Sequence, residues 1–209
     1  MAHADYAGSV YPDKWQVLGV ELKPFSLGHY FKLRKLGCTF VSDDAEEATI
    51  KDLVLGVIVC SMGSHPDHEK DPFWCWLNTP HRSVNLWFWN FTRAQKLSQA
   101  EYEVIQWGRR VGKTDFTEKA KLFAKYLAYY QESPGFYEGD NSSNEPAGGH
   151  WSHSLYHALT SKCGYSSLDA FNAPLRRCLC DFFKLAESEG GGRLMTPQEI
   201  EFANAGGVE

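Results

Sequence analysis

Residues 114–132 read TDFTEKAKLFAKYLAYYQE and form the clearest helical pattern in the chain. Thr114 is a typical N-cap residue, so we expect a helix that begins near residue 115 and continues to about residue 132. Apolar side chains recur at intervals of i, i+4, i+7, i+11 and i+14, at Phe116, Ala120, Phe123, Leu127 and Tyr130. This spacing places them on one face of an α-helix, which predicts that the face is buried.

Start and stop signals of the same kind occur on both sides of this segment. Gly37 is expected to end a helix over residues 27–36, and Ser98 with Glu101 forms a capping box that begins a helix to about Val111. Pro80 is expected to divide an aromatic segment into two short helices. The chain is therefore predicted to be mainly α, with about eight helices and a minor β element within residues 15–20.

The stretch from Ser42 to Met62 allows two interpretations. Ser42, Asp43 or Asp44 can begin a helix, and the acids that follow favour the positive end of its dipole. Residues 53–62 are apolar on nearly all sides, as in a buried helix. A buried strand is the alternative, because this part is rich in β-branched residues. We prefer one continuous helix, since no turn separates the acidic and apolar parts.

The segment from Ser133 to Gly149 is a break in composition, rich in Gly, Ser, Pro and Asn. Such a composition is typical of a linker or a mobile loop. It predicts a helical body over residues 1–133, a linker over 134–149 and a small helical module over 150–209. Within the module, Ser166 is expected to cap a short helix that Pro174 terminates, and a longer helix covers 175–188. The sequence TPQE at 196–199 is expected to begin a final helix.

Composition excludes several classes of protein. Hydrophobic residues make up 43% of the chain and charged residues 22%, which is typical of a globular protein and excludes a wholly disordered one. The net charge of −5 makes binding to nucleic acid an unfavoured function. The start of the chain has no signal-peptide pattern, and the longest apolar run, Leu53 to Cys60, is far shorter than the ~20 residues of a membrane span. We therefore expect a soluble cytosolic protein whose cysteines are reduced and mostly buried.

No known catalytic motif is present, so the chain is predicted not to be an enzyme and to need no cofactor. The exception to weigh is a cluster of histidines at His150, His153 and His157, with Cys163 close by. Histidines at i and i+4 share a helix face and are suited to Zn²⁺. Zinc sites normally draw ligands from two chain segments, and no second segment is identifiable. We therefore prefer the interpretation that these side chains line a solvent-facing or interface-facing side of the helix, with a zinc module or enzyme as the alternative.

Aromatic residues indicate where partners bind. The chain holds 7 Trp, 13 Phe and 10 Tyr, more than a body of this size is expected to bury completely. Exposed aromatic clusters mark interaction surfaces. The expected partner-binding residues flank the polar loop at 63–72 and the predicted linker: Phe73, Trp74, Trp76, Phe136, Tyr137 and Trp151. The alternatives are that the first group forms core and that Phe136 and Tyr137 dock onto the protein's own helices.

Two parts of the sequence resemble uncharacterised proteins from the tail genes of phages and prophages, some of which are described as tail-assembly chaperones. The first part comprises VELKPFSLGHY at 20–30, GCTF at 37–40 and DLVLGVIVCS at 52–61. The second comprises residues 151–199, especially CGYS at 163–166, APL at 173–175, Glu189-Gly190 and LMTPQE at 194–199. Together they cover roughly half of the chain.

The resemblance implies a non-enzymatic role in the assembly or structure of a virion tail. The expected partners are other phage tail proteins, among them the tape-measure protein, which a tail-assembly chaperone would hold. The expected location is the host cytoplasm or the virion. The resemblance carries no catalytic residues, and it leaves the oligomeric state open, an oligomer included.

Overall fold

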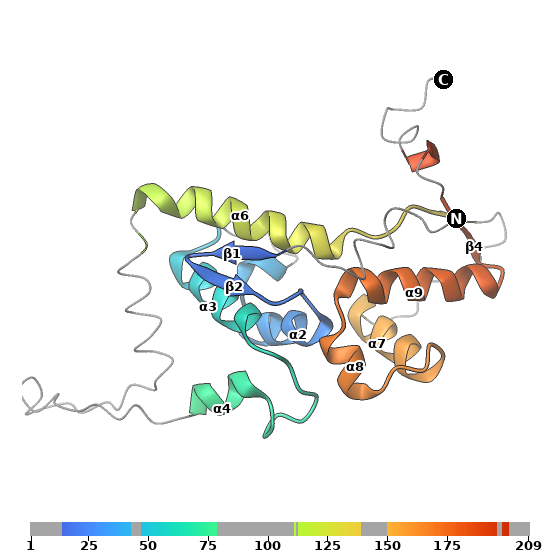
Figure 1. Cartoon of the computed structure of the whole chain (residues 1–209), viewed down its shortest axis with the longest axis horizontal. Helices are drawn as coiled ribbons and strands as arrows, with labels where there is room; N and C mark the ends of the chain where they lie inside the picture. The colour runs from blue at the N-terminus through green and yellow to red at the C-terminus, as the bar shows by residue number, and fades with distance from the viewer. Residues whose placement is uncertain are drawn as a thin grey trace, which may run out of the picture. The chain divides into compact units, whose positions relative to one another are not determined.

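The computed structural model describes residues 14–42, 47–78, 111, 113–138, 150–195 and 198–200. Most of these residues lie in helices, which confirms the predicted mainly α fold (Figure 1). The chain divides into two compact units. The N-terminal unit, as we call it, consists of Trp15–Lys23 and Gly28–Lys125. The C-terminal unit consists of Tyr126–Glu209 together with the short segments Met1–Lys14 and Pro24–Leu27. The division at residues 134–149 that composition predicted stays a prediction.

The N-terminal unit begins with a β-hairpin. β1 (Trp15–Val17) and β2 (Val20–Leu22) pair antiparallel, with Trp15 opposite Leu22. Leu18 and Gly19 form the turn, with φ angles of 53° and 77°. Positive φ at both central residues is typical of the type I′ turn, whose twist matches that of the strands. The predicted N-terminal β element is thus confirmed, and it extends two residues beyond residue 20.

Helix α2 (Leu27–Lys35) ends as its sequence predicts. Gly37 has a φ of 66°, which glycine adopts without strain, and its N–H donates to the carbonyl of Arg34 at 3.1 Å. The next N–H, of Cys38, donates to the carbonyl of Leu33 at 3.0 Å. These two bonds satisfy carbonyls at the end of the helix, and a 3-10 turn, η1 (Thr39–Val41), follows.

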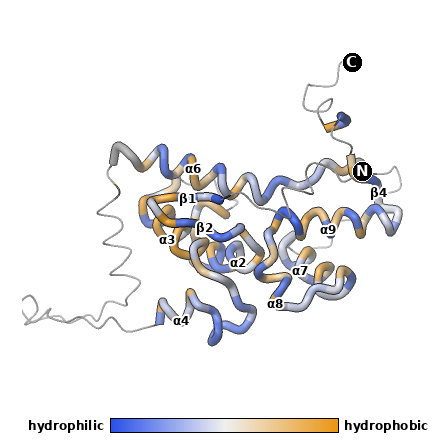
Figure 2. The backbone as a smooth tube through the Cα atoms, in the orientation of Figure 1, coloured by the Kyte–Doolittle hydropathy of each residue, from blue (hydrophilic) through white to orange (hydrophobic). Residues whose placement is uncertain are grey.

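Helix α3 (Ile50–Ser61) forms the most apolar element of the N-terminal unit (Figure 2). Residues 53–60 lie within this helix, so the helical interpretation is correct and the strand alternative is wrong. Every residue from Asp52 to Cys60 is buried. The predicted start at residues 42–44 is also wrong, because residues 47–49 are not helical. A capping box starts the helix instead: Thr49 Oγ1 accepts from the N–H of Asp52 at 3.2 Å, and the Asp52 carboxylate accepts from the N–H of Thr49 at 2.9 Å.

Two further helices follow α3 along the chain: α4 (Pro72–Asn78) and α6 (Lys113–Gln131). On α6, the predicted apolar positions Phe123, Leu127 and Tyr130 are buried, and Tyr126 is buried with them. Phe116 and Ala120 are half-buried. The helix predicted from Ser98, apart from Val111, and the short helix predicted after Pro80 lie outside the described residues.

The N-terminal part of α6 packs against α3 at a glycine. A Cβ added to Gly56 would lie 2.6 Å from two ring atoms of Phe123. The Phe123 ring is fully buried and meets the Phe40 ring edge to face, with centroids 5.0 Å apart. Gly56 is therefore required for this close approach, because no other residue leaves space for the ring.

The C-terminal unit contains α7 (Trp151–Ser161), α8 (Ser167–Asn172) and α9 (Leu175–Ser188). The bounds of α8 and α9 agree closely with the prediction. Ser166 caps α8 as expected, since its Oγ accepts from the N–H of Asp169 at 3.1 Å. Helix α7 packs against both α8 and α9, and the rings of Tyr156 and Phe171 meet edge to face across the first of these contacts.

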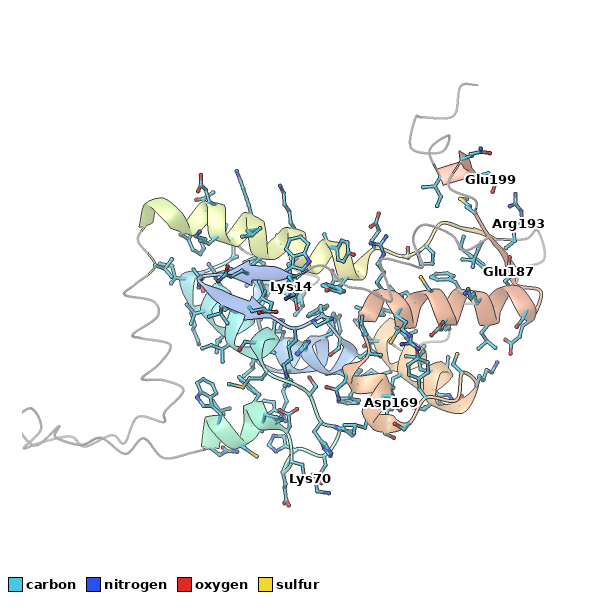
Figure 3. All side chains as sticks on the ribbon, viewed as in Figure 1. Lys14, Lys70, Asp169, Glu187, Arg193 and Glu199 are labelled. Carbon is cyan, nitrogen blue, oxygen red and sulfur yellow. The ribbon has the colours of Figure 1, made fainter. Side chains whose placement is uncertain are left out.

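A second small sheet pairs a strand that precedes α7 with a strand that follows α9. β3 (Phe136–Glu138) and β4 (Gly192–Leu194) pair antiparallel. The carboxylate of Glu187 accepts from the N–H of Leu194 at 3.1 Å, and Arg193 forms an ion pair with Glu199 (Figure 3). Residues 136–138 of the predicted linker thus form a strand, whereas residues 139–149 lie outside the described residues. Of the predicted final helix, residues 198–200 are described and are helical.

Candidate functional site

Helix α7 begins at a histidine. The Nδ1 atom of His150 accepts from the backbone N–H of Ser152 at 3.3 Å and lies 2.8 Å from the Ser152 hydroxyl. A side chain that accepts from the second residue of a helix satisfies one of the unpaired N–H groups at its start. His150 is therefore the N-cap of α7, which fixes where the following side chains point.

A groove of about 670 Å³ lies between α7 and α9. Its apolar lining comes from Ala158 on α7 and from Phe182, Leu185 and Ala186 on α9. Its polar lining on α7 consists of His153, Ser154, His157 and Ser161. Small side chains in this lining, Ala158 and Ala186, leave more open space between two packed helices than larger ones would.

The end of the groove carries one ion pair. Lys162 Nζ lies 2.8 Å from Glu189 Oε1, and both side chains are about half exposed. Glu189 is the acidic residue among the described side chains that line the groove. Within α7, the Nδ1 atom of His157 lies 3.0 Å from the hydroxyl of Ser161, which donates to the carbonyl of His157. The charge of Glu189 is thus compensated, and the remaining polar groups of the lining are imidazoles and hydroxyls.

The three histidines considered for the alternative zinc site lie in different surroundings. His153 and His157 line the groove, whereas His150 caps the helix. Cys163 lines a different hollow, of about 450 Å³, beside Tyr165 and Arg177. Among the described residues, no group of three or more His, Cys, Asp or Glu side chains is placed to hold a metal ion. The histidine pair at i and i+4 remains the part of this cluster that shares a surface.

Two buried thiols and one phenol in the described part of the chain are held in their protonated forms. Burial raises the pKa of the Cys38 thiol to about 11 and that of Cys178 to about 12. Burial and a hydrogen bond to Asp181 raise the pKa of Tyr165. All three groups are therefore protonated at neutral pH, and a thiol in that state is a poor nucleophile.

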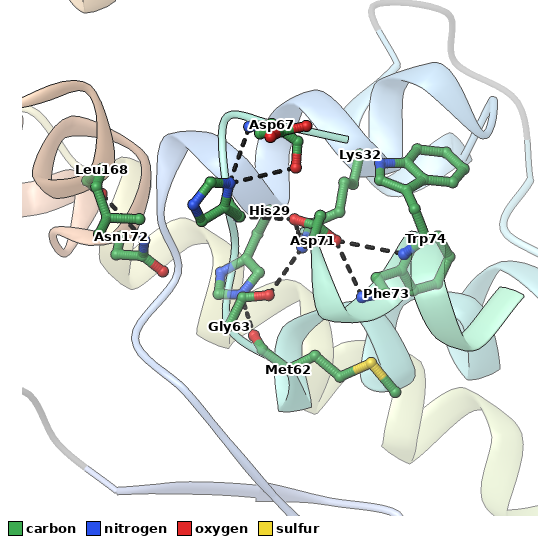
Figure 4. A network of polar contacts seen from close by, with 11 residues as sticks. His29, Lys32, Met62, Gly63, Asp67, Asp71, Phe73, Trp74, Leu168 and Asn172 are labelled. Atoms are coloured by element: carbon green, nitrogen blue, oxygen red, sulfur yellow. Dashed lines mark hydrogen bonds and ion pairs between the residues drawn. The ribbon is translucent and has the colours of Figure 1, made fainter. Parts of the chain in front are cut away.

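The N-terminal unit contains a buried ionic network (Figure 4). Lys32 Nζ lies 3.2 Å from Asp71 Oδ2, and it also donates to the carbonyl of Gly63 at 3.0 Å. The Asp71 carboxylate accepts further bonds from the N–H groups of His65 and Phe73, at 2.8 and 2.9 Å. Asp71 thus anchors the polar loop to α2 and starts α4. Because its acceptor sites are used by these donors, we assign the network a structural role.

The predicted partner-binding residues lie in different surroundings. Phe73 is fully buried. The Trp74 ring stacks on His68 with the ring centroids 4.6 Å apart, and Lys35 Nζ lies 4.6 Å from the Trp74 centroid. Trp76 packs against Phe73 with the ring centroids 5.7 Å apart. Phe136 packs against Phe183 with centroids 4.9 Å apart, and the backbone of Tyr137 pairs with Arg193. Trp151, at 42% exposure, is one of two exposed large apolar side chains in the described part of the chain, with Leu168.

Sequence reasoning missed the α9 side of the groove. Phe182, Leu185 and Glu189 have no motif that distinguishes them from ordinary residues of an amphipathic helix. The strong separation of polar and apolar positions on α9 predicts that one face packs, but not which helix it meets. The pairing of α7 with α9 is a tertiary contact, and a single sequence carries no signal for it.

No protein-family model matches this chain, and neither the curated proteins nor the solved structures contain a significant match to it. In the described part of the chain, no helix combines the length and the apolar character needed to cross a bilayer.

Proposed function

We propose that this chain is a non-enzymatic protein of phage or prophage tail assembly that acts by protein–protein contact. The observation that carries the proposal is the α7–α9 groove with the exposed Trp151 at the start of the same helix. A concave surface with apolar lining, a polar margin and a neighbouring exposed tryptophan has the composition of a binding site for another protein.

The chemistry of the described side chains supports a binding role. The thiols of Cys38 and Cys178, whose pKa values are raised, are protonated. The buried carboxylate of Asp71 accepts hydrogen bonds from Lys32 and from backbone N–H groups. An enzyme needs a nucleophile or a base within reach of a site for the substrate. The groove contains two imidazoles, those of His153 and His157. The other α7 residues in its lining are serines and an alanine, which do not form a catalytic triad with them. The tail-gene resemblance in the segments at 20–61 and 151–199 supplies the biological setting of the proposal.

Co-purification with the products of neighbouring genes tests this function. The tagged chain would be expressed together with the tape-measure protein and the other tail proteins encoded beside it. We expect a stoichiometric complex with one of them. Ala158→Trp fills the apolar lining of the groove and should remove the complex, whereas Ala128→Trp, on an exposed position of α6, should not. The absence of every tail protein from the purified material would refute the proposal.

The same preparations decide between this function and the zinc alternative. Metal analysis of protein purified without a His tag would support a zinc module if it found stoichiometric zinc that His153→Gln with His157→Gln removes. Mass spectrometry of purified virions would show whether the protein stays in the tail or acts only in the host cytoplasm. Both locations are compatible with an assembly role.

A further inference from the structure

We infer that residues 62–78 form a strap that opens from helix α2 as one cooperative unit while α3 stays folded, and that protonation of the buried His29 releases it. The strap consists of Met62, the polar loop and α4. Its opening goes beyond the proposed function, because none of the residues that line the α7–α9 groove takes part in it.

Two side chains of α2, one helical turn apart, hold the start of the strap. His29 Nε2 donates to the carbonyl of Met62 at 2.7 Å, and Lys32 Nζ donates to the carbonyl of Gly63 at 3.0 Å (Figure 4). Lys32 also pairs with Asp71, at the far end of the polar loop, at 3.2 Å. Met62 is the C-cap of α3 and has an extended backbone, so the chain leaves α3 where His29 bonds to it. His29 therefore lies at the hinge of the strap.

One carboxylate ties the polar loop to α4. Asp71 accepts from the N–H of His65 in the loop at 2.8 Å, and from the N–H groups of Phe73 and Trp74 in α4 at 2.9 and 3.4 Å. Its side chain is buried while it pairs with Lys32. When the strap separates from Lys32, water reaches this carboxylate and competes with the three donors for it. The loop and α4 are therefore released together.

The strap buries little apolar surface compared with α3. Within residues 62–78, all of which the structure describes, Phe73 is the buried apolar residue, whereas every residue of α3 from Asp52 to Cys60 is buried. The exposed Lys35 of α2 adds a contact with the Trp74 ring, and a contact of this kind at the surface contributes little. Segments with few buried apolar contacts open at a lower free energy than the core. The strap can therefore open without α3.

A positive charge on His29 is unfavourable while the strap is closed. Burial lowers the pKa of His29 to about 4, the bond to Met62 opposes this effect, and the charges of Lys32 and Lys23 reinforce it. Asp71 favours the charge but lowers the cost only in part. In the open form the imidazole is in water, where its pKa is near 6.5. As the pH falls from 7 to 4, the ratio of open to closed strap should therefore rise about a hundredfold.

Hydrogen exchange of single amides on the full chain, at pH 7 and at pH 4, tests this inference. The amides of His65, Phe73 and Trp74 report on the strap, and those of residues 57–60 report on α3. Rates are compared as protection factors, which removes the effect of pH on the intrinsic exchange rate. We expect the strap amides to be less protected than the α3 amides at both pH values. Their protection should fall about a hundredfold between pH 7 and pH 4.

Two matched variants identify the trigger. His29→Gln keeps an N–H donor for the carbonyl of Met62 and cannot be protonated, so it should remove most of the fall in protection. His68→Gln changes an exposed histidine of the strap itself and should retain the fall. Circular dichroism at both pH values confirms that each variant is folded.

Strap amides as well protected as those of α3 at pH 4 would overturn the inference, because the strap would then open only with the whole unit. A fall of the same size in His29→Gln would overturn it as well, because another group would be the trigger. If His29→Gln does not fold, the wild type still decides. Equal protection of the strap at pH 7 and pH 4 would refute the release by protonation.

Discussion

His29 is held in its neutral form inside the N-terminal unit. Its side chain is buried, and since a carbonyl oxygen only accepts, Nε2 donates to the Met62 carbonyl at 2.7 Å. Burial lowers the pKa of His29 from 6.5 to about 4, and the positive charge of Lys32 acts in the same direction.

This shift of the His29 pKa predicts a loss of stability in acid. Between pH 6.5 and about 4 the unfolded chain takes up a proton at this position and the folded chain does not, so the free energy of unfolding falls as the pH falls. The contribution is about 3 kcal/mol over the whole range. Urea unfolding of the wild type and of His29→Gln, which keeps an N–H donor, should show a weaker pH dependence in the variant. His68→Gln, at an exposed histidine of the same unit, should retain the wild-type dependence. Identical pH profiles for wild type and His29→Gln would contradict this account.

The Lys32–Asp71 pair makes a second prediction at the level of single residues. Burial lowers the pKa of Lys32, and the nearby carboxylate of Asp71 opposes this effect. Asp71→Ala leaves a buried ammonium group without its counter-charge. It also removes the acceptor for three backbone N–H groups, those of His65, Phe73 and Trp74. We expect a loss of about 3–5 kcal/mol in the free energy of unfolding.

Lys32→Met is the matched variant for this pair. It leaves the Asp71 carboxylate with its backbone donors, so the loss measured by urea unfolding should be smaller than for Asp71→Ala. Equal or reversed losses would show that the backbone contacts of Asp71 contribute little to the stability of the unit.

At the level of elements, the contact between α3 and α6 depends on Gly56. Gly56→Ala improves helix propensity by about 1 kcal/mol, but its Cβ would lie 2.6 Å from the buried ring of Phe123. Overpacking of this kind costs about 1–3 kcal/mol. We therefore expect a net destabilisation by thermal or urea unfolding. In a Phe123→Leu background the same Gly56→Ala change should be neutral or stabilising, and a destabilisation of similar size there would refute the steric explanation.

The accuracy of the sequence predictions differs between elements for a physical reason. The bounds of α8 and α9 and the end of α2 were predictable, because Ser166, Pro174 and Gly37 act through hydrogen bonds or backbone geometry within a few residues. The start of α3 was predicted too early, because Ser42 and the acids after it are also good helix starters. Only the structure shows that the capping box of Thr49 and Asp52 is the one used.

Strands and sites were less predictable than helices. β3 pairs with β4 across more than 50 residues of sequence, and a three-residue strand in a Gly- and Pro-rich segment has no periodicity to detect. The sequence predicted one side of the candidate site, because the residue types of His153, His157 and Trp151 singled them out. Phe182, Leu185 and Glu189 were not, because their contribution depends on how α9 packs against α7.

At the level of the C-terminal unit as a whole, the contact of Phe136 with Phe183 links the small sheet to α9. We expect Phe136→Ser to lower the melting temperature by about 5 °C or more, because it removes a ring contact and places a hydroxyl in its position. The same variant should be assayed for capture of tail proteins. Lower stability with unchanged capture would assign Phe136 to the fold, and an unchanged melting temperature would contradict the role inferred from the contact.

At the level of the whole molecule, the proposed function requires that the α7–α9 groove binds a partner in tail assembly. The most direct test is calorimetric titration of the purified chain with the tape-measure protein of the phage or prophage that the proposal assigns it to. The account predicts saturable binding that Ala158→Trp weakens at least about tenfold and Ala128→Trp leaves unchanged. No binding, or binding of equal strength by all three proteins, would contradict the claim that this groove is the site where the protein acts.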